Sequence, residues 1–346
     1  MEKKKLLDIF SRLEKEEIPI KLHLNSRVLI IDGMNMFMRS FSVMNRVNLD
    51  GNDIGGLIGF LYSLRSAVKF LNPTRVVVVF DGEGGAVNRQ YLYPQYKQNR
   101  TGNKVINYRS FSSKEEEKIA MYNQIERLID YLMNLPITNI SIDKLEADDV
   151  IGFLTGHIYK EYDDSEIYVM STDSDFLQLV NNRVRVYNPI KKKIYNPRVV
   201  LEDYNIHPNN FIIYKTLIGD TSDNILGVAG FGPINSVKIF PFLKEEKIST
   251  LENLYEHCEN QKGKNKIVQR LLETKNNVEI MYKIMDLKNP NISNNDIDFI
   301  KEIYNSEVTT FNKMGILKIY SDDRMGDAIP KIHTWIDSFT YLNGYK

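Results

Sequence analysis

The chain has 346 residues, of which 42% are hydrophobic and 26% charged, as is typical of a globular protein with one large domain or two smaller ones. It carries 45 basic and 45 acidic residues, and the resulting net charge of zero gives no sign of a nucleic-acid binder. The single cysteine, Cys258, excludes an internal disulfide and favours a reducing, cytoplasmic compartment. The longest aliphatic run, 76–79, is too short for a membrane span, and acidic residues interrupt the N-terminus before a signal-like segment forms.

The first half of the chain alternates between strand and helix patterns. Residues 1–26 are an extension whose apolar spacing predicts a short amphipathic helix that packs on the protein body: Leu6, Ile9, Phe10 and Leu13. Continuous β-branched runs predict buried strands at 27–32, 75–81, 137–142 and 166–172, and helical spacing predicts helices at 55–71 and 115–135. Residues 183–187 and 192–195 resemble a hairpin or edge pair. The alternation predicts an α/β fold with a mostly parallel central sheet flanked by helices.

The pattern changes after about residue 205. Residues 208–220 predict a helix, a Gly-rich turn follows at 227–232, and another helix is expected at 234–240. The chain stays helical in pattern to residue 285. Residues 286–346 are polar, rich in Asn and Asp, and show no clear periodicity.

Acidic residues stand directly after the predicted strands, and a further pair precedes the Gly-rich turn. They are Asp32, Asp81, Glu146, Asp148, Asp149, Asp173, Asp175, Asp220 and Asp223. The carboxyl ends of strands in an open α/β sheet line one crevice, so acids from separate segments are expected to meet there. Taken alone, an acid such as Asp32 is more simply explained as a helix cap.

Nine carboxylates in one crevice would repel one another unless cations bind among them. Oxygen ligands without His or Cys indicate hard divalent ions, chiefly Mg²⁺ with Mn²⁺ as a substitute, rather than zinc. Two such ions about 4 Å apart can clamp a phosphodiester, one activating water and the other stabilising the leaving oxygen. The sequence therefore predicts phosphodiester hydrolysis.

Basic residues gather between Gly84 and Ser113, where there is no acid: Arg89, Lys97, Arg100, Lys104 and Arg109. Positive charge aimed at phosphate oxygens would stabilise a reacting phosphodiester. Without the acidic cluster, a solvated loop would be the simpler interpretation. The aromatic side chains of 91–96 could stack on unpaired bases or pack within this segment.

Six ordered motifs resemble those of the flap endonuclease and 5′–3′ exonuclease family: "LIIDGMN", "VVVFDGEG", "YPQYKQNR", "EADDVIGFL", "STDSDFLQL" and "GDTSDNILGVAGFG". The match covers roughly residues 27–245, and the flanking regions resemble the phage replication branch, which includes phage ribonuclease H. The resemblance implies a PIN-like nuclease core over 27–205, a helical arch or gateway at about 84–115, and a helical duplex-binding region with a helix–turn–helix element over 206–285. Residues 286–346 then form a separate polar region.

The resemblance also implies roles for single residues. The implied ligands of a first metal ion are Asp32, Asp81, Glu146 and Asp148. Asp173 and Asp175 would lie between two ions or in their inner shell, and the second-metal or outer acids would be Asp149, Asp220 and Asp223. Helix spacing instead places Glu146 and Asp149 on one face, unless the helix begins only near Asp148.

Lys97 and Arg100 match the family's basic pair beside the scissile phosphate, with Arg89, Tyr96 and Lys104 as helpers along the threaded strand. Arg39 could also reach phosphate, or it could have only a surface role. The glycines of the turn, Gly227, Gly230 and Gly232, would permit close approach to a duplex backbone. Lys238 is the first basic residue after this turn, so duplex affinity is expected to be weak or to depend on a partner.

The main hypothesis is a Mg²⁺-dependent, structure-selective 5′ nuclease that acts on 5′ ends or flaps of DNA and RNA–DNA duplexes and removes RNA primers in replication. A monomer in the cytoplasm is expected, inside the host if the protein is phage-encoded. The family suggests a replication clamp or a single-strand-binding protein as partner. The alternatives are a PIN-type ribonuclease, a non-catalytic branched-DNA-binding protein and a Mg²⁺-dependent phosphatase, although the phosphatase would show Asp-x-Asp after the first strand.

Overall fold

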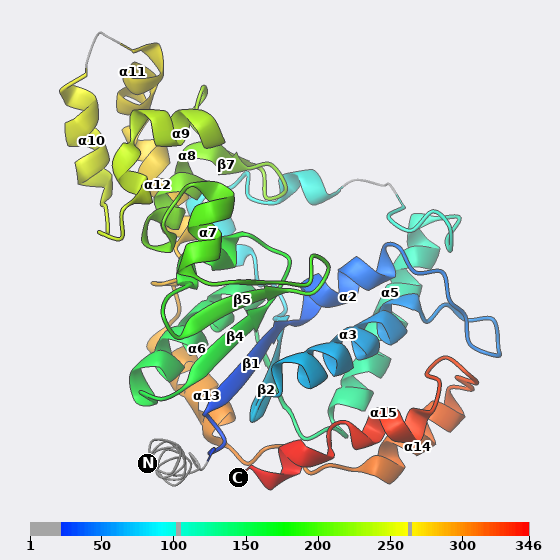
Figure 1. Cartoon of the computed structure of the whole chain (residues 1–346). Coiled ribbons are helices and arrows are strands. Elements are labelled where there is room, and N and C mark those ends of the chain that lie inside the picture. Colours follow the sequence, from blue (N-terminus) through cyan, green and yellow to red (C-terminus); the bar gives the residue numbers. More distant parts are fainter. Residues whose placement is uncertain (1–21, 102–104, 262–264, 346) are drawn as a thin grey trace, which may run out of the picture.

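The structure is a computed structural model that describes residues 22–101, 105–261 and 265–345 (Figure 1). The helix predicted around Leu6–Leu13 and the basic residue Lys104 lie outside the described residues. Within the described ranges, no helix is both long and apolar enough to cross a bilayer.

A six-stranded sheet forms the centre of the molecule in the order β3-β2-β1-β4-β5-β6. The strands are β1 (Arg27–Asp32), β2 (Arg75–Asp81), β3 (Thr138–Ile142), β4 (Glu166–Met170), β5 (Val184–Asn188) and β6 (Lys193–Tyr195). The first five are parallel, and β6 pairs antiparallel with β5 as an edge hairpin. All four predicted strands and the hairpin are confirmed, although β4 ends two residues before the predicted 172.

Helices cover both faces of the sheet. Alternate residues of each strand point to opposite faces, so a single strand can contribute to two cores. Leu29 and Ile31 of β1 join a core with α2 (Gly33–Phe41), α3 (Gly55–Leu71) and α5 (Lys114–Leu132). Val28 and Ile30 join a second core with α6 (Ala147–Glu161) and α13 (Asn294–Asn305). The predicted fold class, a mostly parallel sheet flanked by helices, is confirmed.

A helical region stands at the carboxyl edge of the sheet (Figure 1). It contains α7 (Pro197–Tyr204), α8 (Phe211–Ile218), the hairpin strands β7 (Gly219–Asp220) and β8 (Ile225–Leu226), and α9 (Pro233–Ile239). It continues through α10 (Leu251–Glu259), α11 (Lys266–Glu273) and α12 (Lys275–Met285). The described part of the expected arch consists of α4 (Val87–Leu92) and a 3₁₀ turn, Gln98–Thr101, and no single long helix spans it.

The last part of the chain, which shows no clear periodicity, completes the fold. Helices α14 (Lys313–Asp322) and α15 (Ile332–Asp337) lie beside α3 and α5 (Figure 1). Ile316, Trp335 and Phe339 are buried in the core that these helices share. The Trp335 indole N–H also donates to the Leu61 carbonyl of α3 at 3.3 Å.

Candidate active site

A crevice at the carboxyl edge of the sheet collects many of the acidic residues. It has a volume of about 390 Å³ and lies where β1 and β2 end, beside the first turn of α6. Its charged lining consists of Asp32, Asp81, Asp148, Asp173, Asp223, Arg39, Lys97 and Arg100. Separate segments therefore deliver acids to one place, as the sequence predicts.

Hydrogen bonds fix the two acids that end strands. Asp32 Oδ1 accepts a hydrogen bond from Asn35 N at 3.1 Å and so caps α2, while its Oδ2 accepts from the Ser171 hydroxyl at 3.0 Å. Asp81 Oδ1 accepts from Ala147 N at 2.7 Å, at the start of α6. These carboxylates cap helices and line the crevice at the same time.

Four crevice acids have no ion-pair partner among residues 22–101, 105–261 and 265–345: Asp32, Asp81, Asp148 and Asp173. Burial raises the pKa of Asp32 to about 7, and repulsion from Asp81 and Asp173 adds to the effect. Burial also raises the pKa of Asp148 well above its ordinary value, as do the charges of Asp32 and Asp173. Arg89 and Lys97 act to lower the pKa of Asp148, but burial and the neighbouring carboxylates outweigh them.

The chemistry of these four groups suits a hard divalent cation, because all donors are carboxylate oxygens and a cation would relieve both repulsion and burial. Their side chains are not closed around one point. Among the described residues, no three His, Cys, Asp or Glu side chains are arranged to hold an ion as they stand. Carboxylates that repel one another without a counter-charge favour separation. The chemistry of the ligand atoms therefore fits a metal ion, whereas their spacing does not define a metal site.

The other predicted metal acids are paired with protein cations, and Arg89 is central to this pairing. The residue is only 7% exposed, and its guanidinium binds Asp149 through two hydrogen bonds of 2.7 and 3.0 Å. It also contacts Glu146 and donates from Nε to the Ile284 carbonyl at 2.8 Å. Burial acts to lower the pKa of Arg89, but the carboxylates outweigh it and raise the pKa. The structure therefore makes Arg89 a buried partner of acids and not a contact for a threaded strand.

The first turn of α6 separates its acids by direction. Glu146 precedes the helix, which begins at Ala147, and both Glu146 and Asp149 face Arg89. Asp148 instead lines the crevice. The helix-spacing argument, which puts Glu146 with Asp149, therefore describes this turn better than the grouping of Glu146 with Asp148.

Lys97 reaches into the acids from the basic segment. Its ammonium contacts Glu146, and its backbone N donates to the Asp223 carbonyl at 2.9 Å. Burial acts to lower the pKa of Lys97, but Glu146 and Asp223 outweigh it and raise the pKa. Tyr96 is only 2% exposed, and its hydroxyl donates to Glu146 at 2.9 Å. Tyr96 therefore packs beneath the segment and is not exposed to stack on a base.

Arg100 and Arg39 lie at the exposed margin of the crevice. Arg100 pairs with Asp223 and donates from Nε to the Ser222 carbonyl at 3.3 Å. Arg39 Nε donates to the Thr172 hydroxyl at 3.0 Å. Both guanidiniums remain within reach of a ligand in the crevice.

One site residue was missed from the sequence. Lys215, buried on α8, lies 2.8 Å from Asp175 Oδ1 and 2.9 Å from Asp220 Oδ2. Burial nevertheless raises the pKa of Asp175 to about 7, with Asp173 adding to it. Burial also acts on Asp220, but bonds from Ser222 and the charge of Lys215 lower its pKa. The signal in the sequence is a lone lysine inside the apolar run 211–218, because a lysine in such a run is expected to be buried and paired with a carboxylate.

The Gly-rich turn is tight at two of its three glycines. A Cβ on Gly227 would lie 2.3 Å from the Ile218 carbonyl carbon, and Gly230 has a φ of +102°. Gly232 is extended, with a φ of −156°, and a Cβ there would meet nothing within 4 Å. Lys238 is exposed on α9.

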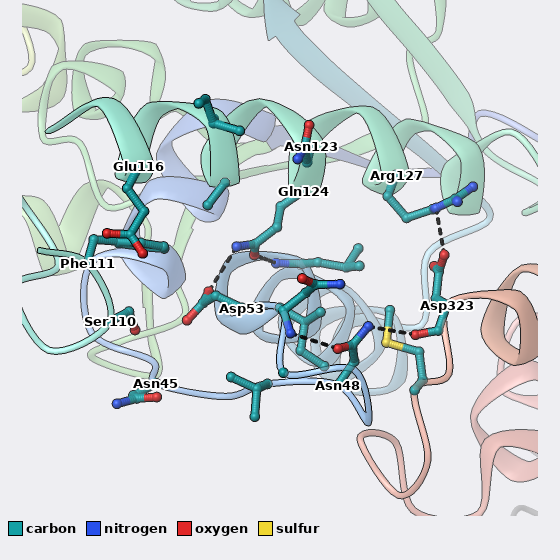
Figure 2. Close-up of a pocket in the computed structure, with 18 of the residues that line it drawn as sticks. Asn45, Asn48, Asp53, Ser110, Phe111, Glu116, Asn123, Gln124, Arg127 and Asp323 are labelled. Carbon is teal, nitrogen blue, oxygen red and sulfur yellow. Dashed lines mark hydrogen bonds and ion pairs between the residues drawn. The ribbon is translucent and has the colours of Figure 1, made fainter. Parts of the chain in front are cut away.

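A second, larger cavity of about 950 Å³ is lined by residues shown in Figure 2, and none of its lining residues is a predicted metal acid. It is enclosed by the loop around 45–54, helix α5 and the loop at Asp323. Gln124 of α5 donates to Asp53 at 2.9 Å across it, and Arg127 pairs with Asp323 at 2.9 Å. The last part of the chain therefore contributes to the wall of this cavity.

The protein is an α/β protein with a mostly parallel sheet, carboxylates gathered at the carboxyl edge of the sheet, and a helical region beside them. The profile of the 5′–3′ exonuclease N-terminal resolvase-like domain matches residues 27–205, and that of the C-terminal SAM fold matches 206–301. The chain therefore belongs to the 5′–3′ exonuclease family.

Relatives of similar length support this membership. A 5′–3′ exonuclease of Buchnera aphidicola (subsp. Acyrthosiphon pisum) is 30% identical over 272 residues, which are 76% of this chain and 87% of the relative. The Bacillus subtilis 5′–3′ exonuclease is 32% identical over 250 residues, covering 69% and 78%. Nuclease activity is the common property of these named proteins.

The fold also matches a solved structure of the bacteriophage T5 flap endonuclease, described as a pseudo-enzyme–product complex with DNA and metal ions. The TM-score is 0.61 at 19% identity, and the match covers 86% of this chain and 99% of the other. This likeness concerns the fold.

Proposed function

We propose that the protein is a structure-selective 5′ nuclease that hydrolyses phosphodiester bonds at 5′ ends or flaps of DNA and RNA–DNA duplexes. One observation carries the proposal: a crevice lined by four carboxylates without ion-pair partners in the described chain also receives Lys97 and Arg100. Such a crevice combines groups for hard cations with groups for a phosphate.

The residues divide into two roles. Asp32, Asp81, Asp148 and Asp173 would hold Mg²⁺, or Mn²⁺ in its place. Two bound ions would supply water activation and stabilisation of the leaving oxygen. Lys97 and Arg100 would then bind the phosphate oxygens; in the structure both cations are paired with acids. A phosphate can take over these contacts because it offers the same charge-assisted hydrogen bonds.

The helical region supports a grip on duplex backbone. Gly230 is exposed in the turn with a φ of +102°, and Lys238 is exposed on the following helix. Contacts of this kind are independent of base sequence. Recognition would therefore depend on the junction and not on bases, which suits both DNA flaps and RNA primers.

We propose that this activity serves replication in the cytoplasm. The protein would be a monomer of the phage ribonuclease H type and would work beside a replication clamp or a single-strand-binding protein. A PIN-type ribonuclease is disfavoured because the C-terminal exonuclease profile matches 206–301. A non-catalytic role is disfavoured because all nine acids of the motifs are present.

The test uses a 3′-labelled 5′-flap duplex, an RNA-primed duplex and a plain single strand, with Mg²⁺ or EDTA. We expect Mg²⁺-dependent cutting near the junction, lost in Asp148→Ala and slowed roughly 100-fold or more in Lys97→Ala. Asp298→Asn, at an exposed acid of α13, is the matched control and should cut like the wild type. Binding without cutting under every metal condition would overturn the proposal.

A further inference from the structure

The segment Gln95–Arg100, which carries both proposed phosphate contacts, lies against the hairpin Gly219–Leu226. Lys97 N donates to the Asp223 carbonyl at 2.9 Å. Two asparagine side chains form cross-links in opposite directions. Asn99 Nδ2 donates to the Thr221 carbonyl at 2.8 Å, and Asn224 Nδ2 donates to the Gln95 carbonyl at 2.7 Å. The main chain of the segment is therefore held by the hairpin, and the main chain of the hairpin is held by the segment.

Side chains within the same contact connect it to the acids. The single O–H of Tyr96 is shared between Glu146 at 2.9 Å and Asp223 at 3.2 Å, and Arg100 pairs with Asp223. The hairpin also carries Asp220, which is bound to Lys215. A displacement of the hairpin would consequently move the acidic side chains of the hairpin together with the basic side chains of the segment.

Backbone strain at the centre of the segment gives the contact a purpose. Lys97 has a φ of +57°, a left-handed conformation that is unfavourable for a residue with a Cβ. The neighbouring hydrogen bonds hold that conformation and so aim the Lys97 side chain at Glu146 and the crevice. Without them, the segment can relax to an ordinary conformation and carry the ammonium elsewhere.

Asn224 is suited to this contact in two ways. Its φ of +58° is a left-handed conformation that asparagine tolerates better than most residues, and its N–H closes the hairpin turn on the Thr221 carbonyl at 3.3 Å. Its amide then reaches the segment across the gap. The shape of the hairpin turn and the hydrogen bond to the segment Gln95–Arg100 therefore both depend on Asn224.

We propose that Asn224 and Asn99 are positioning residues, which fix the main chain around Lys97 so that its ammonium meets the reacting phosphate. The inference rests on the proposed function for the role of Lys97. The two asparagines touch neither acids nor substrate in this scheme. They act only through the segment Gln95–Arg100.

The variants separate the cross-link from the turn. Asn224→Gly keeps the left-handed turn accessible and removes only the amide. Asn224→Asp keeps the size but replaces the donor with a charged acceptor facing the Gln95 carbonyl. Asn235→Ala is the matched control, because Asn235 Nδ2 likewise donates to a backbone carbonyl, that of Gly230 at 2.8 Å, without touching the segment.

Hydrogen exchange of the peptide that covers 93–101 is the first readout. Loss of one hydrogen bond should speed exchange there roughly 3-fold to 10-fold in both Asn224 variants and in Asn99→Ala. The control should leave it unchanged, and melting temperatures should stay within about 3 °C of the wild type. Unchanged exchange in the Asn224 variants would overturn the proposal.

Single-turnover cutting of the 5′-flap duplex with excess protein is the second readout. We expect Asn224→Gly to cut roughly 10-fold slower with a duplex Kd within about twofold of wild type, because orientation and not binding is lost. Lys97→Ala combined with Asn224→Gly should cut no slower than Lys97→Ala alone. Additive losses would show that Asn224 acts by another route. If the wild-type protein cuts nothing, the proposed function fails, and exchange still decides whether the hairpin fixes the segment.

Discussion

Replacement of Arg89 by methionine provides a direct measure of how strongly the acids depend on protein cations. The guanidinium is buried and has hydrogen bonds to Asp149, Glu146 and the Ile284 carbonyl. Arg89→Met fills a similar volume but leaves Asp149 buried without its cation. Breaking one side of a buried ion pair costs about 3–5 kcal/mol, a large part of a typical stability of about 5–15 kcal/mol.

The loss should be partly recovered when the uncompensated charge is also removed. Glu146 still has Lys97 and the Tyr96 hydroxyl, so Asp149 is the group left without compensation. Asp149→Asn in the Arg89→Met background should therefore restore at least about 1.5 kcal/mol relative to the sum of the two single changes. The Arg89→Met variant and the double variant should both remain folded in EDTA.

Urea unfolding in EDTA at pH 7.5 measures these differences, because the one tryptophan, Trp335, is buried and reports the folded core. Asp298→Asn again serves as an exposed control. A cost below about 1 kcal/mol for Arg89→Met, or strictly additive changes in the double variant, would refute the claim that this guanidinium neutralises the acids in the folded protein.

Two further outcomes are expected. In EDTA the free energy of unfolding should fall by roughly 1 kcal/mol from pH 6.5 to 8, because Asp32 and Asp175, with pKa values of about 7, retain protons in the folded chain that the unfolded chain has already lost. Carboxylates with lowered pKa values titrate below this window, and added Mg²⁺ should abolish the fall; a flat thermal-melting profile in EDTA would contradict this. Gly152→Ala should lower stability by about 1–3 kcal/mol, since a Cβ there would lie 2.1 Å from the Leu287 carbonyl oxygen. Gly156→Ala, on the same helix with nothing within 4 Å, should instead raise it by about 0.5–1 kcal/mol, and equal melting temperatures for the two variants would count against the packing argument.

The regular elements of the core could be predicted because their signals are local. Strands β1 and β2 are continuous β-branched runs, and α3 matches its expected bounds of 55–71. Helix α2 was not expected, because it is short and begins directly where β1 ends. The helices after residue 286 depend on contacts with residues far away in the chain, such as Trp335 with Leu61, and such contacts leave no local pattern.

The site was predictable in its membership but not in its pairings. Acids at strand ends reach one edge by topology, so Asp32, Asp81 and Asp148 could be placed together. Burial of Arg89 could not be foreseen, because a basic residue in a basic segment looks the same in sequence whether it faces solvent or acid. Lys215 was foreseeable from its apolar surroundings, although its two carboxylate partners are set by the tertiary fold.

The contact between Trp335 and Leu61 joins residues 274 positions apart and has a consequence for how the chain folds. During synthesis the sheet and the whole crevice are made before α14 and α15, whose side chains cover α3 and α5. Until those helices arrive, an apolar face of the new protein is open to water and to other chains. The sheet and its crevice are therefore most prone to aggregation in the interval before α14 and α15 pack against α3 and α5.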